Sequence, residues 1–153
     1  MFLLHRKYIF CLVAMFTFLS CDSSFKSAIP DYPVYLERNI NTDALELRTI
    51  GGYKTYTTIE RIGDAIGYGG LLVIHGFDDN YYAFDLACPH EIKSNIRVVP
   101  NSAGQAVCDS CKSVFSIGYG SGNHLSGPAK EGLRRYQISV YETVSGTIFR
   151  VTR

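Results

Sequence analysis

Short runs of apolar and β-branched residues alternate with turn residues along most of the chain. Runs of this kind predict strands, and they occupy residues 34–38, 45–49, 53–59, 71–75, 81–86, 96–99, 114–117, 136–141 and 147–151. Residues 77–80 and 144–146 carry the Asp, Asn, Ser and Gly residues typical of hairpin turns. One helical turn is expected near residues 60–65, and no internal repeat is visible. The pattern predicts an all-β fold.

The first twenty residues follow a different pattern. A short basic stretch, His5-Arg6-Lys7, precedes twelve largely apolar residues, 8–19, and Ser20-Cys21 follows them. Twelve residues are too few to span a hydrocarbon core of about 30 Å, so a cleaved signal peptide is expected. The small Ser20 before Cys21 resembles a bacterial lipoprotein cleavage site, which implies a signal peptide over residues 1–20 and a lipidated Cys21. The alternative is a plain secretory signal with a free Cys21.

Residues 21–31 are polar and rich in serine, and they are predicted to form a tether from the lipid. Residues 32–153 then form one domain, which is long enough for one modest core. This organisation predicts a cell-envelope protein that is lipid-anchored to a bacterial membrane and faces the periplasm or the exterior. The whole chain has a net charge of +1, and losing Arg6 and Lys7 with the signal changes it to −1. A nearly neutral surface predicts no nucleic-acid partner.

Nitrogen and sulfur ligands lie close together in two short segments. The chain has five cysteines, of which Cys11 would leave with the signal and Cys21 would take lipid. The three that remain are an odd number for a disulfide framework. Together with one histidine they make a complete set of four, because thiolate and imidazole are ligands of both zinc and cluster iron. The candidate metal ligands are Cys88, His90, Cys108 and Cys111.

The residues after the second cysteine pair extend this pattern. They are Ser113, Phe115, Gly118, Gly120, Gly127-Pro128-Ala129, Leu133 and Tyr136. The order C-x-H, C-x-x-ligand-x-Ser, Gly-Pro-Ala and L-x-x-Y resembles the Rieske iron–sulfur domain. Cys111 stands where the family has its second His. The resemblance implies a stack of small antiparallel β-sheets with two ligand-bearing loops at one tip.

The resemblance also implies a cofactor, a [2Fe-2S] cluster. Cys88 and Cys108 would hold one iron, and His90 and Cys111 the other. Ser113 would donate a hydrogen bond toward a bridging sulfide, and the Pro128 loop would lie near the cluster. A third thiolate adds one negative charge, so the reduction potential is expected at or below the low end of the Rieske range of about −150 to +300 mV.

The function implied by the resemblance is electron transfer. The chain shows no substrate pocket or catalytic triad, so a carrier is expected rather than a stand-alone enzyme. It would exchange electrons with a redox partner protein, which the sequence does not identify.

Two alternatives replace the cluster and leave a structural or interaction module. A Cys3His zinc site is one, because Cys-x-x-Cys is a common zinc knuckle. A metal-free domain is the other, with Cys108 and Cys111 oxidised in the cell envelope. A zinc knuckle has no need of the Gly-Pro-Ala loop around Pro128, which favours the cluster. His124, expected to be a solvated loop residue, is the alternative source of an imidazole.

Overall fold

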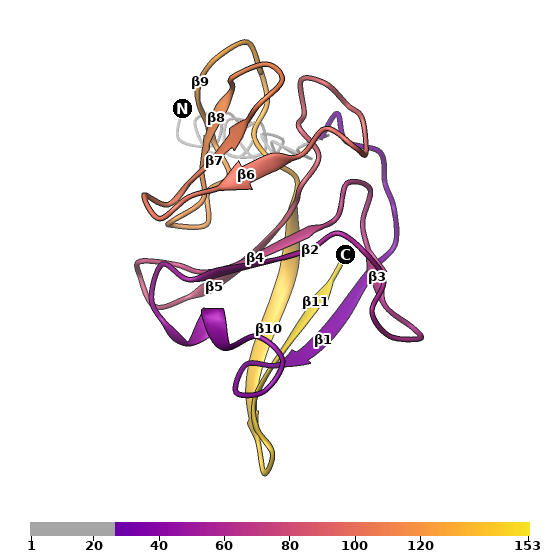
Figure 1. Cartoon of the computed structure of the whole chain (residues 1–153), viewed down its shortest axis with the longest axis vertical. Helices are drawn as coiled ribbons and strands as arrows, with labels where there is room; N and C mark the ends of the chain where they lie inside the picture. Colours follow the sequence, from indigo (N-terminus) through magenta and orange to yellow (C-terminus); the bar gives the residue numbers. More distant parts are fainter. Residues whose placement is uncertain (1–26) are drawn as a thin grey trace, which may run out of the picture.

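The computed structural model describes residues 27–153, which include the domain predicted for residues 32–153 (Figure 1). The predicted signal peptide, Cys21 and most of the predicted tether lie outside the described residues. The described elements are β1 (Val34–Asn39), η1 (Leu45–Arg48), β2 (Tyr53–Tyr56), β3 (Ala65–Ile66), β4 (Leu71–His75), β5 (Tyr81–Asp85), β6 (Val98–Pro100), β7 (Gln105–Cys108), β8 (Val114–Ser116), β9 (His124–Ser126), β10 (Arg135–Thr143) and β11 (Gly146–Thr152).

These strands form two sheets in which neighbouring strands are antiparallel. The larger sheet has the order β2-β4-β5-β10-β11-β1-β3, and the smaller has the order β6-β7-β8-β9. Figure 1 shows the smaller sheet at one end of the molecule and the β10–β11 hairpin extending to the other. The predicted all-β class with antiparallel sheets is confirmed. Within residues 27–153, no helix has the length and apolarity needed to cross a membrane.

Strand β4 is buried over its whole length because it separates two hydrophobic cores. Leu71 and Val73 pack in the core of the larger sheet, together with Phe149. Leu72 and Ile74 pack in a second core, between the two sheets. A strand covered on both faces needs apolar residues at every position, which explains the continuous run in the sequence.

The two predicted hairpins are present. Strands β4 and β5 pair on either side of residues 76–80, where the Gly76 amide donates to the Asn80 carbonyl at 2.7 Å. Strands β10 and β11 pair as far as Thr143 and Gly146. The glycine has a φ of +115°, a value that strongly favours a residue without a side chain.

Two local predictions are wrong. Residues 45–49 were expected to form a strand, but Leu45–Arg48 is a short 3-10 helix. The sequence Leu-Glu-Leu has the alternation of a strand, and the helix buries Leu47 while Leu45 stays 54 % exposed. The helical turn expected near residues 60–65 is a tight turn, in which the Asp64 amide donates to the Arg61 carbonyl, followed by β3. Asp64 accepts hydrogen bonds from the Arg61 amide and from Arg38, and this fixes the turn.

Candidate metal centre

Two loops bring three predicted ligands together at the edge of the smaller sheet. Cys88 lies in the connection from β5 to β6, Cys108 ends β7, and Cys111 lies in the turn from β7 to β8. Their sulfur atoms all lie within 4.8 Å of one another. The Sγ atoms of Cys88 and Cys111 are 3.6 Å apart, and all three cysteines are free thiols. The arrangement can therefore present three thiolates to one metal centre.

The two loops share one backbone arrangement. In the first, the Ile92 amide donates to the Cys88 carbonyl at 2.9 Å, and in the second the Lys112 amide donates to the Cys108 carbonyl at 2.8 Å. Both donors are in the left-handed region, with φ of 51° for Ile92 and 60° for Lys112. This conformation is unfavourable for a side chain with a branched Cβ. Each loop therefore makes the same closed turn around its first cysteine.

Residues 127–129 contact the second ligand loop through Ser113. The Ser113 side chain is buried, and its Oγ accepts a hydrogen bond from the Ala129 amide at 3.0 Å. The same Oγ lies 3.1 Å from the Cys111 sulfur. A Cβ on Gly127 would meet the Ser113 backbone at 2.5 Å, so glycine is required for this close approach. Pro128 follows on the exposed side of this loop.

The thiols differ in acidity because their surroundings differ. Burial raises the pKa of Cys88, and the amides of Glu91 and His90, which hydrogen-bond its sulfur, only partly oppose this effect. Burial also raises the pKa of Cys111, but hydrogen bonds from the side chain and backbone of Ser113, together with those of Cys88 and Cys108, outweigh it and hold the pKa of this thiol below its usual value. Cys111 is half-buried, whereas Cys88 and Cys108 are fully buried. Cys111 is therefore favoured over Cys88 to become a thiolate.

The two candidate histidines lie apart from the sulfur group. His90 is exposed, and within residues 27–153 it is not among the ligand atoms that gather within 4.8 Å. The His124 Nε2 hydrogen-bonds the Gly127 carbonyl at 3.1 Å, and its ring meets Phe115 edge-on. One nitrogen of His124 is thus already engaged. The ligand role of His90 stays a prediction.

The sequence interpretation did not identify a residue that supports the first loop. Asp85 is fully buried, and its carboxylate accepts hydrogen bonds from the amides of Tyr68, Gly69 and Ala87. A Cβ on Gly69 would meet the Ala87 amide at 2.5 Å. An acidic residue inside the apolar run before Cys88 was the available signal. Asp85 fixes the backbone from which the first ligand loop departs.

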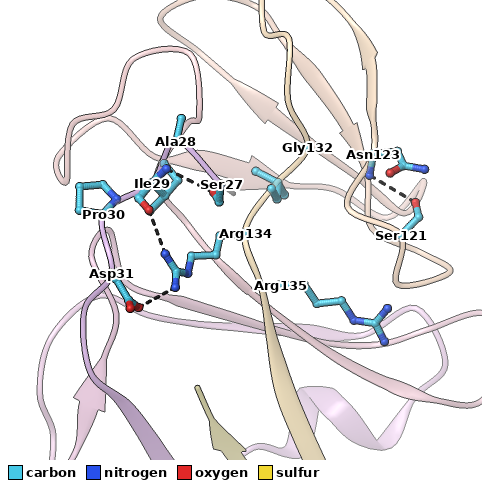
Figure 2. A pocket seen from close by; sticks show the side chains of 11 residues that line it. Ser27, Ala28, Ile29, Pro30, Asp31, Ser121, Asn123, Gly132, Arg134 and Arg135 are labelled. Carbon is cyan, nitrogen blue, oxygen red and sulfur yellow. Dashed lines mark hydrogen bonds and ion pairs between the residues drawn. The ribbon is translucent and has the colours of Figure 1, made fainter. Parts of the chain in front are cut away.

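A groove that is separate from this centre is lined by residues 27–31, 132–135, Ser121 and Asn123 (Figure 2). Arg134 donates to the Ile29 carbonyl at 2.9 Å and to the Asp31 carboxylate at 2.6 Å. The Glu131 carboxylate accepts from the Ala28 amide at 2.7 Å. None of the three sulfur atoms lines this groove. These contacts tie the start of the described chain to the segment that follows the Gly-Pro-Ala loop.

No family model and no curated protein matches the chain. Among solved structures, the chain is similar to the quaternary ammonium Rieske monooxygenase CntA in complex with the inhibitor MMV12. The TM-score is 0.49 at 18% sequence identity, and the match covers 82% of this chain and 32% of that chain. The chain therefore spans less than a third of the length of that enzyme.

Proposed function

We propose that the chain binds a [2Fe-2S] cluster through Cys88, Cys108 and Cys111 and carries single electrons. The observation behind this proposal is that three thiols from two loops gather within 4.8 Å, with the Ser113 oxygen 3.1 Å from the Cys111 sulfur. Thiolates are the usual ligands of iron–sulfur clusters, so the donor set fits the group. The fourth ligand would come from the first loop, where the resemblance implies His90. A bound cluster supplies a centre that takes up and releases one electron.

The surrounding residues suit this role. Burial of Cys88 and Cys108 shields the inner side of the centre from water. Cys111 and His90 lie on the solvent side, where a partner protein can approach. The Ser113 oxygen already accepts from Ala129, which leaves its proton free to point at the Cys111 sulfur. A hydrogen bond to a ligand sulfur stabilises the reduced state and raises the reduction potential.

We also propose a location at the membrane and a redox protein as partner. With Cys21 lipidated, the domain would be held at a bacterial membrane on its outer side, and its partner would be a redox protein. The role proposed is that of a carrier, because a thiolate-bound [2Fe-2S] cluster takes up and releases single electrons.

Visible absorption of the purified full chain, with metal and acid-labile sulfide analysis, tests the proposal. We expect a coloured protein that contains iron and sulfide. A colourless protein containing zinc would support the second candidate below. A colourless protein without metal would overturn both candidates.

One observation favours a second candidate, a single zinc ion in a structural or interaction module. The resemblance assigns Cys88 and Cys111 to different irons, yet their sulfur atoms are only 3.6 Å apart. A tetrahedral ion with metal–sulfur bonds of about 2.3 Å places its sulfur ligands about 3.8 Å apart. The observed spacing fits two ligands of one ion. Metal analysis separates the two candidates.

A further inference from the structure

Cys88 and Cys111 face each other across the two ligand loops. Their Sγ atoms are 3.6 Å apart, and both side chains are free thiols. A disulfide joins sulfur atoms about 2.05 Å apart, so a movement of about 1.5 Å is enough to form the bond. Backbone hydrogen bonds hold both loops, from the Cys88 amide to the Ile96 carbonyl at 3.1 Å and from the Lys112 amide to the Cys108 carbonyl at 2.8 Å. The two sulfur atoms are therefore held near each other before any reaction.

The two thiols differ in their access from solvent. Cys111 is half-buried, and its neighbours Ser110 and Lys112 are exposed. Cys88 is 0% exposed. Access is one of the factors that set the rate of thiol–disulfide exchange. A dissolved disulfide compound therefore reaches the Cys111 sulfur first, and Cys88 reacts with a sulfur that is already inside the centre.

We propose that Cys111 and Cys88 form a thiol–disulfide exchange site in the metal-free chain. Its substrate class is a small disulfide compound such as oxidised glutathione. The Cys111 thiolate attacks one sulfur of this compound, which forms a mixed disulfide and releases one glutathione thiolate. The Cys88 thiolate then attacks the Cys111 sulfur, which forms the Cys88–Cys111 bond and releases the second glutathione thiolate. Two protein thiols are oxidised, the compound is reduced to two glutathione thiols, and the two protons lost by the protein end on those thiols.

This pairing differs from the one that the sequence spacing favours. Cys108 and Cys111 are close in sequence, and oxidation of this pair was the alternative expected from the sequence. The structure instead sets the Cys111 sulfur against a sulfur of the opposite loop. Cys108 would keep its thiol in the oxidised chain.

The disulfide would regulate the proposed metal binding. It removes two of the three thiolates that the proposed function assigns to a cluster, so a chain in this state cannot bind one. It also links the connection from β5 to β6 with the turn from β7 to β8. The regulation rests on the proposed function, but the exchange reaction needs no metal and is tested independently of it.

Reaction of the reduced, metal-free full chain with oxidised glutathione tests the proposal. All samples carry Cys11→Ser and Cys21→Ser, so the remaining thiols are Cys88, Cys108 and Cys111. N-ethylmaleimide blocks the thiols that stay free, and it is added before the protein is denatured so that the disulfides do not rearrange.

Proteolysis and mass spectrometry then identify the bonded pair. Trypsin leaves Cys88 within residues 62–93 and the other two cysteines within residues 98–112, and cleavage before Asp109 separates those two. We expect the Cys88 fragment to be joined to the Cys111 fragment. The Cys108 fragment should carry N-ethylmaleimide.

The two fully buried cysteines provide a matched pair of variants. Cys88→Ser should slow disulfide formation within the chain about tenfold or more, and the glutathione adduct of Cys111 should accumulate. Cys108→Ser should change the rate of Cys88–Cys111 bond formation by no more than about twofold. A purely structural role for Cys88 would not trap the adduct on Cys111.

The outcomes separate this proposal from the proposed function. A disulfide between any other pair in the parent chain would overturn it, and so would a parent chain that forms no disulfide or stops at the glutathione adduct. A Cys88→Ser variant that forms a disulfide as fast as the parent would also overturn it. None of these results depends on iron, and the iron and sulfide content of the isolated protein tests the proposed function separately.

Discussion

The Tyr136 hydroxyl donates a hydrogen bond to the buried Asp85 carboxylate at 2.8 Å. This contact joins the start of β10 to the end of β5, from which the Cys88 loop departs. Burial and the neighbouring Asp85 carboxylate raise the pKa of Tyr136, which keeps its proton available for donation. The tyrosine that completes the L-x-x-Y pattern therefore stabilises the first ligand loop through its hydrogen bond to Asp85.

Replacing this tyrosine should destabilise the domain. Tyr136→Phe removes the hydroxyl donor to Asp85 Oδ2, which then keeps only the Tyr68 amide, and the expected loss in free energy of unfolding is about 1–3 kcal/mol. Urea unfolding followed by circular dichroism measures it. Tyr119→Phe is the control, because Tyr119 is 66% exposed and its change should stay within about 0.5 kcal/mol. Equal effects of the two variants would contradict the supporting role of Asp85 and Tyr136.

Strong apolar patterns predicted the centre of the fold well. Leu71–His75 was predicted to the residue, because burial on both faces leaves an uninterrupted apolar run. The short strands Gln105–Cys108 and His124–Ser126 were not predicted. Their sequences are mixed or polar, and their pairing depends on backbone hydrogen bonds to neighbours in the smaller sheet. Tertiary context decides such strands more than their own residues do.

The thiol centre could be predicted from sequence. The backbone turn and the buried carboxylate that hold its loops in place could not. Cys88, Cys108 and Cys111 gather as their spacing indicated. The positive φ of Ile92 opposes the preference of a β-branched residue, so no local rule predicts the turn that it closes. The partners of Asp85 are mostly backbone amides, which carry no sequence signature.

Acid should destabilise the domain through Arg38 and Asp64. Arg38 is 3% exposed and pairs with Asp64 at 2.5 Å. The hydrogen bond from Arg38 is the largest cause that holds the pKa of Asp64 below its usual value. A lowered folded-state pKa stabilises the protein above the ordinary carboxyl pKa, and this stabilisation disappears as the pH falls through the folded-state value. The free energy of unfolding should therefore fall below about pH 4.

Urea unfolding between pH 7 and pH 3 measures this dependence. Asp64→Asn should lower stability at neutral pH by about 3 kcal/mol, since it leaves buried Arg38 poorly compensated. It should also weaken the dependence of the free energy of unfolding on pH below about pH 4. Glu142→Gln, on an exposed part of β10, should keep the parent curve. An acid dependence that Asp64→Asn leaves unchanged would assign the effect to other carboxylates.

Ser113→Ala should raise the pKa of the Cys111 thiol in the metal-free chain. The hydroxyl lies 3.1 Å from the sulfur and stabilises its thiolate form. The measurement is the alkylation rate of Cys111 against pH, followed by peptide mass spectrometry. The curve should move to higher pH. Ser110→Ala is the control, because Ser110 donates to Glu91 instead, and a matching shift there would indicate a general loosening of the loop.

Cys21→Ser should release the protein from membranes. Anchoring would depend on acyl chains, which contribute about 0.8 kcal/mol for each buried CH₂. Membrane fractionation and mass analysis of the mature amino terminus measure this change. Cys11→Ser is the control, because Cys11 would leave with the signal peptide. A Cys21→Ser variant that remains wholly in the membrane fraction would indicate that residues 8–19 are retained as an anchor.

Cys111→His should raise the reduction potential of the reconstituted iron–sulfur protein. An imidazole in place of a thiolate removes one unit of negative charge, whichever residue of the first loop is the fourth ligand. Less negative charge in a poorly solvated site favours the reduced state. Protein-film voltammetry should show the variant moving toward the Rieske range of about −150 to +300 mV. Ser110→His places an imidazole on the neighbouring exposed residue without changing the thiolates, so its potential should stay near that of the parent. An unchanged or lower potential in Cys111→His would mean that Cys111 does not hold iron.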